Sequence, residues 1–272
     1  MYDRQERMHP ELLLILYLFV VVVSLFCYFY PIPFHQWGAE YIVAAIILLF
    51  TFLVYRKNFT LFVSILFFVL LYLSHPLIRV QETLIPLHFP GVLFAIPVIA
   101  YIVILHLSRK CRGEISWRAA GSVDRCSLLL MLAVIVISAF ALIGWTLILE
   151  PDLKPILSWI PRVHIGLLIL GGFGFALSNA LVEELIYRGI LWDGLKSTVR
   201  STAAVIIIQA GLFGLWHWRG FPGGVVGVLL VFVWGILLGI IRRRTGGMLA
   251  PILTHIGADL TIFGILLLIV QK

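Results

Sequence analysis

Apolar runs of roughly 20 residues recur along almost the whole chain, and this recurrence limits the possible folds more than any other property. A helix can cross a bilayer because it satisfies its backbone hydrogen bonds internally, and each crossing needs about 20 apolar residues. Of the 272 residues, 62% are hydrophobic and 12% are charged. Ordinary soluble domains carry roughly 25% charged residues. This composition excludes a water-soluble enzyme, a nucleic-acid-binding domain and a disordered chain.

The apolar runs divide into nine segments. They are residues 12–30, 39–55, 59–74, 91–107, 128–149, 164–192, 203–217, 223–241 and 248–270. Three polar residues alone separate the second segment from the third, so this pair is either two spans or one poorly spanning unit. We therefore predict an all-α fold, a polytopic integral membrane helical bundle of about eight or nine transmembrane helices.

The charge distribution indicates the orientation of these helices. If the segments alternate from an N-terminus on the inner side, most of the 20 Lys and Arg residues fall in inner loops, as the positive-inside rule requires. The basic inner loops then account for the net charge of +7, and we predict no nucleic-acid partner. Basic loops on one side favour a bacterial inner membrane over the endoplasmic reticulum.

The longest polar stretch, residues 108–127, marks the predicted boundary between two parts of the chain. Residues 1–127 form N-terminal transmembrane helices of unknown role. Residues 128–272 form the part that carries the chemical motifs. The three cysteines show neither the pair spacing of a metal site nor a disulfide framework.

Five ionisable side chains lie deep in apolar sequence, all of them in the C-terminal half. They are Glu183, Glu184, His217, His255 and Asp259. An ionisable group in hydrocarbon costs several kcal/mol unless it is paired or hydrated, so such residues indicate a functional site.

These residues belong to three short motifs with partners four positions apart. The motifs are Glu183-Glu184-Leu-Ile-Tyr-Arg188, Phe213-Gly-Leu-Trp-His217 and His255-Ile-Gly-Ala-Asp259. Residues four apart share one helical face, so each motif should contain its own contact: Glu184 with Arg188, Phe213 with His217, and His255 with Asp259. The adjacent glutamates point about 100° apart on a helix and are expected to have different partners.

Taken together, the motifs resemble those of the CAAX protease and bacteriocin-processing family, also called the Abi family, of intramembrane endopeptidases. The similarity rests on Glu-Glu-x-x-x-Arg, Phe-x-x-x-His and His-x-x-x-Asn/Asp in this order, with one span between the second and third, and it covers roughly residues 164–268. Each motif alone is weakly specific, whereas the ordered set within membrane helices is fairly specific.

The resemblance implies a role for each matching residue. Glu183 would act as general base on a water, helped by His217, while His255 and Asp259 would polarise the scissile carbonyl and stabilise its oxyanion. Glu184, Arg188 and Phe213 would support the site, and the four catalytic side chains would line one hydrated internal cavity. Many family members have Asn where this chain has Asp259, and an ionised Asp cannot donate a hydrogen bond. Asp259 would then be protonated or would orient His255.

A zinc ion is the alternative to this metal-free mechanism. His217, His255 and Glu183 would be its ligands, because catalytic zinc sites use three protein ligands and a water. The chain has no His-Glu-x-x-His sequence and no cysteine ligand nearby. We therefore predict that no cofactor is needed. Neither the Gly-x-Ser-Gly setting of rhomboid proteases nor a second intramembrane aspartate is present.

The predicted substrate is a membrane-tethered protein or peptide, processed in a CAAX-type, bacteriocin-type or C-terminal sorting-type reaction; bacteriocin self-immunity also fits the resemblance. Two alternatives come from other classes of protein. In a transporter the same polar residues would form a proton or cation path. In a membrane scaffold each would only lock helices together.

Ideal straight helices would not bring the motifs to one depth, because His217 would lie near the outer end of its span and Glu183 in the inner half. We expect the glycines at positions 171, 172 and 174 to break the sixth segment and move Glu183 deeper, or the seventh segment to tilt. The glycines at positions 223, 227, 235 and 239 predict close helix packing by the eighth segment.

Overall fold

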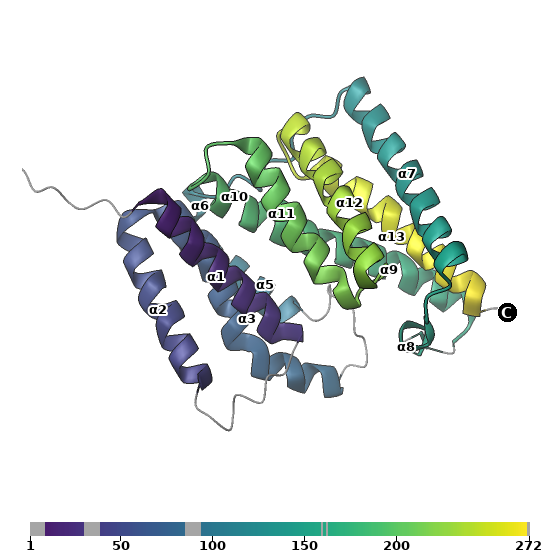
Figure 1. Ribbon diagram of the computed structural model, residues 1–272, viewed down its shortest axis with the longest axis horizontal. Coiled ribbons are helices and arrows are strands. Elements are labelled where there is room, and N and C mark those ends of the chain that lie inside the picture. The colour runs from purple at the N-terminus through teal and green to yellow at the C-terminus, as the bar shows by residue number, and fades with distance from the viewer. Residues whose placement is uncertain (1–8, 30–38, 85–93, 159, 162, 271–272) are drawn as a thin grey trace, which may run out of the picture. The chain divides into compact units, whose positions relative to one another are not determined.

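The computed structural model describes residues 9–29, 39–84, 94–158, 160, 161 and 163–270 (Figure 1). Throughout these residues the regular structure is helical and no strand is present, which confirms the predicted all-α class. Each of the nine apolar segments is helical where it is described.

In the N-terminal half the helices are α1 (Pro10–Phe29), α2 (Ala39–Lys57), α3 (Phe59–Leu84), α5 (Ala95–Leu107), α6 (Arg109–Gly113) and α7 (Arg125–Leu149). In the C-terminal half they are α8 (Lys154–Leu157), α9 (Ile165–Glu184), the π-helix η2 (Leu185–Ile190), α10 (Leu191–Lys196), α11 (Thr202–Trp216), the 3-10 helix η3 (His217–Arg219), α12 (Gly224–Thr245) and α13 (Leu249–Val270).

Four helical stretches of the described chain are long and apolar enough to cross a membrane. They are α7, the continuous stretch Ile165–Lys196, α12 and α13. Shorter apolar helices occupy Pro10–Phe26, Phe59–Ser74 and Ala95–Leu107. Length and composition therefore support an integral membrane protein with four spans, and they do not establish the predicted total of eight or nine.

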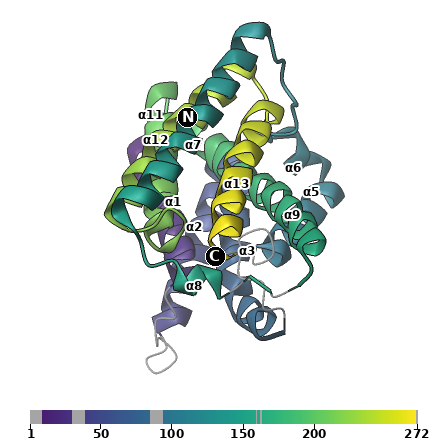
Figure 2. The same cartoon turned by 90° about the vertical axis from the view of Figure 1, so that its right-hand side faces the viewer.

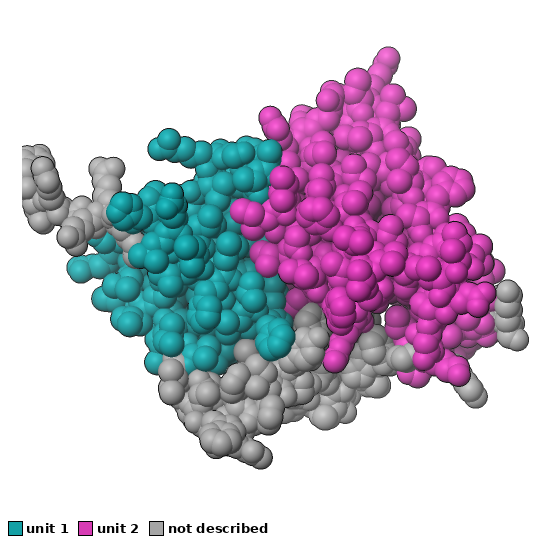
Figure 3. Space-filling model, viewed as in Figure 1, with its two compact units in different colours: residues 1–79, 96–115, 190–205 teal, residues 80–95, 116–189, 206–272 magenta. Residues whose placement is uncertain are grey.

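The chain forms two compact units, coloured separately in Figure 3. Unit 1 comprises residues 1–79, 96–115 and 190–205, and unit 2 comprises residues 80–95, 116–189 and 206–272. All residues of the three motifs lie in unit 2. The separate roles assigned to residues 1–127 and 128–272 stay a prediction.

Polar contacts hold the helices of unit 1 together. The Tyr17 hydroxyl lies 2.6 Å from the Ser64 hydroxyl, which donates to the Ile190 carbonyl oxygen at 2.7 Å. The junction between α2 and α3 is a single residue, Asn58, whose side-chain oxygen accepts a hydrogen bond from the Leu61 backbone N–H. This cap explains how two helices follow each other with one residue between them.

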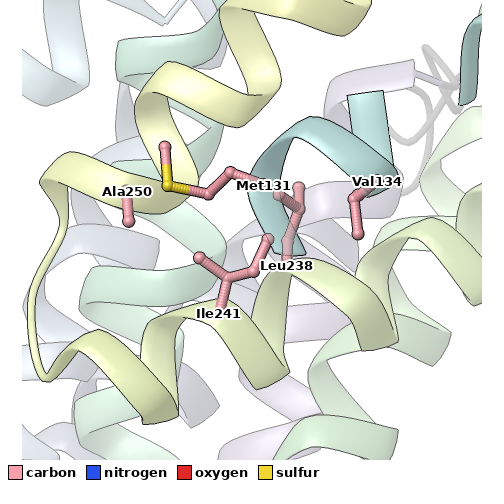
Figure 4. Packing of buried hydrophobic residues seen from close by; sticks show 5 residues of the cluster. All are labelled: Met131, Val134, Leu238, Ile241 and Ala250. Atoms are coloured by element: carbon pink, nitrogen blue, oxygen red, sulfur yellow. The ribbon is translucent and has the colours of Figure 1, made fainter. Parts of the chain in front are cut away.

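In unit 2, α13 packs against α9, α7 and α12, and Figure 2 shows it beside α7 and α9. Figure 4 shows the buried cluster that joins three of these helices. It consists of Met131 and Val134 from α7, Leu238 and Ile241 from α12, and Ala250 from α13. Because α13 carries the third motif and α9 the first, this packing determines whether the two motifs meet.

Glycines permit the close approach of α12 to α11, as predicted. A Cβ atom at Gly235 would lie 3.0 Å from the Ala210 Cα atom, and one at Gly239 would be equally close to α11 side chains. Small residues let helix backbones approach in this way. Gly223 and Gly227 pack instead against backbone atoms of the segment just before α12, so only half of the predicted glycine set faces another helix.

The expectation that glycines break the sixth segment is wrong. Helix α9 is continuous from Ile165 to Glu184, through all three glycines. Gly172 lies against α13, where a Cβ atom would come within 2.5 Å of the Phe263 ring, so its role is packing. The helical geometry changes only after Glu184, where the π-helix begins.

The polar stretch before α7 is ordered by the α12–α13 turn. Backbone hydrogen bonds of 2.9–3.1 Å join residues 119–122 to residues 245–249. The Asp124 carboxylate then caps α7 by accepting from the Ser127 backbone N–H at 2.6 Å. Hydrogen bonds from the Ser127 hydroxyl and backbone lower the pKa of Asp124.

The packing of α11 on α12 predicts opposite effects for two glycines of one helix. A Cβ atom at Gly214 would lie 2.7 Å from the Val228 carbonyl oxygen, whereas one at Gly211 would meet no atom within 4 Å. Gly214→Ala should therefore lower the free energy of unfolding by about 1–3 kcal/mol. Gly211→Ala should be neutral or stabilising by up to about 1 kcal/mol. Equal melting temperatures for the two variants in detergent would contradict this helix contact.

Candidate active site

The first and third motifs come together where α9 lies against α13. The side chains of Glu183, Glu184, His255 and Asp259 all point into this contact and are at most 4% exposed. Residues more than 70 positions apart thus form one buried polar cluster among apolar helices.

His255 is the centre of this cluster. Its Nδ1 atom lies 2.7 Å from Glu184 Oε1, and its Nε2 atom lies 3.5 Å from Glu183 Oε2 and 3.7 Å from Asp259 Oδ1. Because a carboxylate only accepts hydrogen bonds, His255 Nδ1 carries the proton that it donates to Glu184. The two glutamates do point in different directions, but they share His255 as a partner, because its nitrogens lie at opposite edges of the ring.

Glu184 also forms the expected pair with Arg188. Their Oε1 and Nη1 atoms are 2.9 Å apart, and both side chains are fully buried. The guanidinium donates further to the Gly235 carbonyl oxygen at 3.3 Å and lies 4.5 Å from the centre of the Phe213 ring. A buried cation is thus compensated by a carboxylate, a carbonyl and an aromatic face.

Phe213 brings the second motif to the cluster. Its ring centre lies 4.7 Å from that of His217, as the motif spacing predicts, and 6.1 Å from that of His255. It is almost fully buried and also packs on Tyr187, at 4.6 Å between ring centres. One aromatic ring therefore neighbours both imidazoles.

His217 is half-buried and begins the short helix η3 at the end of α11. Its Nδ1 atom lies 3.0 Å from the Phe213 carbonyl oxygen. Since a carbonyl only accepts, Nδ1 is the donor, and in the neutral ring Nε2 retains its lone pair. His217 thus approaches the cluster across Phe213, in contrast to His255, which contacts the carboxylates directly.

Three polar side chains to which the motifs gave no role complete the site. Asn179 donates to Asp259 Oδ2 at 3.1 Å, Gln209 donates to the Gly235 carbonyl oxygen at 2.9 Å, and Tyr187 is 1% exposed. Asn179 precedes Glu183 by four residues and Gln209 precedes Phe213 by four. The helical spacing that defines the motifs could therefore have revealed both.

Arg242 was also missed, because its place in the basic run 242–244 indicated a loop. It lies within α12 and is 4% exposed. Its Nε atom donates to the Arg188 carbonyl oxygen at 3.2 Å, and a terminal nitrogen donates to the Ser116 hydroxyl at 3.0 Å. A π-helix rearranges the backbone hydrogen bonds of its turn, and here Arg242 supplies a donor to one carbonyl of η2.

The cluster contains most of the buried polar side-chain atoms that have no hydrogen-bond partner in the protein. Eight such side-chain atoms occur in the described residues, and six belong to Asn179, Glu183, Glu184, Tyr187, Arg188 and Gln209. Buried polar atoms are almost always hydrogen-bonded, to protein or to ordered water. Their concentration at one place distinguishes this site from the rest of the unit.

The zinc ligands predicted from the sequence are not arranged as a metal site in the described residues. Across the described part of the chain, no three His, Cys, Asp or Glu side chains are arranged to hold a metal ion. The set predicted for zinc, His217, His255 and Glu183, does not form such a group, and both nitrogens of His255 face carboxylates.

Comparison with known families agrees with the resemblance read from the motifs. The family model described as type II CAAX prenyl endopeptidase Rce1-like matches residues 165–261, a range that includes all three motifs. The match covers less than half of the chain, and together with the apolar helices it makes this part of the chain similar to membrane-embedded proteases of the CAAX type. No curated protein and no solved structure gave a significant match.

Arg188 and Arg244 allow a direct comparison of a buried and an exposed ion pair. Arg188→Met should lower the free energy of unfolding by about 3–5 kcal/mol, because it leaves Glu184 buried without its cation. Arg244→Ala breaks an exposed pair with Asp124, at 3.4 Å, and should cost under about 1 kcal/mol. Chemical denaturation in detergent measures both. Adding Glu184→Gln to Arg188→Met should recover part of the loss, and no recovery would contradict the ion-pair explanation.

Proposed function

We propose that this protein is an intramembrane endopeptidase that hydrolyses a peptide bond by a water activated by glutamate and histidine. The observation that carries the proposal is that the carboxylates of Glu183 and Asp259 lie within 3.7 Å of His255 Nε2, amid buried polar atoms that have no hydrogen-bond partner in the protein. Such atoms suit a site that receives water and a polar substrate group.

Glu183 is the proposed general base. Its Oε2 atom is buried and accepts no hydrogen bond from the protein, so it is available to a water molecule. In the first step Glu183 accepts a proton from that water while the oxygen attacks the peptide carbonyl carbon. Glu183 later returns the proton to the departing amine, which balances the reaction.

The proposed donor to the carbonyl oxygen is His255, and the proposed role of ionised Asp259 is to orient His255. Negative charge develops on that oxygen in the transition state, and donors placed in advance stabilise it. Glu184 supports this role, since it accepts from His255 Nδ1 and so determines the orientation of the ring. His217, whose Nε2 keeps its lone pair in the neutral ring, is the proposed helper of Glu183 and would accept a hydrogen bond from the water.

The proposed substrate is a membrane-associated protein or peptide with its scissile bond near the bilayer. CAAX-type, bacteriocin-type and C-terminal sorting-type processing all supply such a bond, and self-immunity would use the same chemistry. The proposed location is a bacterial inner membrane in preference to the endoplasmic reticulum. We propose no cofactor and no nucleic-acid partner.

The arrangement of the polar groups supports this function over the alternatives. A transport path would need polar groups distributed along the helices, whereas here they gather around one imidazole. A scaffold would satisfy each polar group separately, whereas six buried polar atoms of this cluster have no hydrogen-bond partner in the protein.

Cleavage of tethered peptides tests the proposal. Purified protein in liposomes should hydrolyse at least one member of a panel of prenylated and helix-anchored peptides. Glu183→Gln, His255→Ala and His217→Ala should each lower kcat by at least about 100-fold, because general acid–base catalysis contributes 10²–10⁴-fold. Gly211→Ala serves as the folded control. Ion flux that the same three substitutions abolish, without cleavage, would establish the transporter instead.

Metal chelators separate the two mechanisms. Dialysis against 1,10-phenanthroline should leave the cleavage rate of the wild-type protein unchanged, because no three His, Cys, Asp or Glu side chains of the described residues are arranged to hold a metal ion. A loss of activity that zinc restores, together with one zinc per chain by elemental analysis, would contradict the metal-free mechanism.

A further inference from the structure

Asn179 and Asp259 form a pair across the α9–α13 contact. Asn179 Nδ2 lies 3.1 Å from Asp259 Oδ2, and the two side chains are 6% and 2% exposed. Asn179 stands one helical turn before Glu183, and Asp259 stands one turn after His255. Four side chains therefore form two facing pairs, Asn179 with Asp259 and Glu183 with His255.

The chemistry of the two groups determines their orientation. An ionised carboxylate has no hydrogen to give, so the amide nitrogen of Asn179 must face it and the amide oxygen must face away. With Oδ2 occupied by Asn179, the other oxygen of Asp259, Oδ1, is the one that faces His255 Nε2, at 3.7 Å. The orientation of Asp259 toward the reacting groups thus depends on Asn179.

We propose that Asn179 is a positioning residue that holds Asp259 in the geometry needed for catalysis. The pair needs one carboxamide and one carboxyl group, and either α9 or α13 can carry either group. This inference rests on the proposed function. It extends that function, because the motifs assign no role to position 179. It also explains how the site accommodates a carboxylate at position 259, since a neighbouring carboxamide stabilises its charge.

The hydrogen bond is removed by Asn179→Leu, which keeps the side-chain volume and suits an apolar helix. Its loss should lower kcat about 10- to 100-fold, as expected for a hydrogen bond to a charged group, with little change in KM. Ser178→Ala is the matched control. Ser178 neighbours Asn179 on α9 and bonds only within that helix, to the Gly174 and Phe175 carbonyl oxygens, so cleavage should remain at the wild-type rate.

An exchange of the two groups tests the pair itself. Asn179→Asp alone places two carboxyl groups side by side, so it should lower kcat and alter the pH dependence of kcat, because the groups must share a proton. Adding Asp259→Asn restores one carboxamide and one carboxyl group with their helices exchanged. The double variant should regain a kcat within about threefold of the wild-type value, which corresponds to about 0.65 kcal/mol of activation free energy. It should also recover the wild-type pH profile.

Two results would overturn the inference while leaving the proposed function intact. One is wild-type kcat and pH profile in folded Asn179→Leu and Asn179→Asp. The other is a folded double variant that stays as inactive as Asn179→Asp.

If the wild-type protein cleaves no peptide, the proposed function fails, and infrared titration of the Asp259 carboxyl band still tests the pair. Asn179→Leu should then shift that titration, and an unchanged band would contradict the contact.

Discussion

The contact between His255 and two carboxylates is the interaction on which the site depends. Ionisable groups among apolar helices are costly unless paired, and here one imidazole serves both glutamates through its opposite nitrogens. The same contact ties α9 to α13, so the pairing that compensates the buried charges also assembles the first and third motifs. A site built in this way requires the helix packing and the charge compensation to occur together.

A second layer of contacts surrounds this interaction. Arg188 compensates Glu184 and contacts the Gly235 carbonyl, while the Phe213 ring packs on the guanidinium and neighbours both imidazoles. Gln209 donates to the same carbonyl oxygen of α12. These contacts join α11 and α12 to the pair formed by α9 and α13. The supporting residues therefore both pack the helices and compensate charge. Glu184 is held by Arg188 and His255, whereas Glu183 contacts His255 alone among these side chains, at 3.5 Å.

Helical spacing predicted part of this arrangement correctly. The contacts of Glu184 with Arg188 and of Phe213 with His217 follow from residues four apart on one face, and both are present. Asn179 follows the same rule but was not predicted. An uncharged polar side chain costs less free energy in an apolar segment than a charged one, so it is a weaker indicator of a functional site. Arg242 could not be found in this way, since nothing in a basic run separates a buried arginine from an exposed one.

The amino-acid sequence by itself determined that this is a helical membrane protein and which side chains enter the apolar layer. These properties are local, because the cost of transfer into hydrocarbon and the helical repeat act over a few turns of chain. Only the tertiary structure decided that Glu183 and Glu184 meet one histidine, that α9 continues through its glycines and that a π-helix follows Glu184. These outcomes depend on packing between helices more than 60 residues apart, where small differences in approach and helical phase select the partner of each polar group.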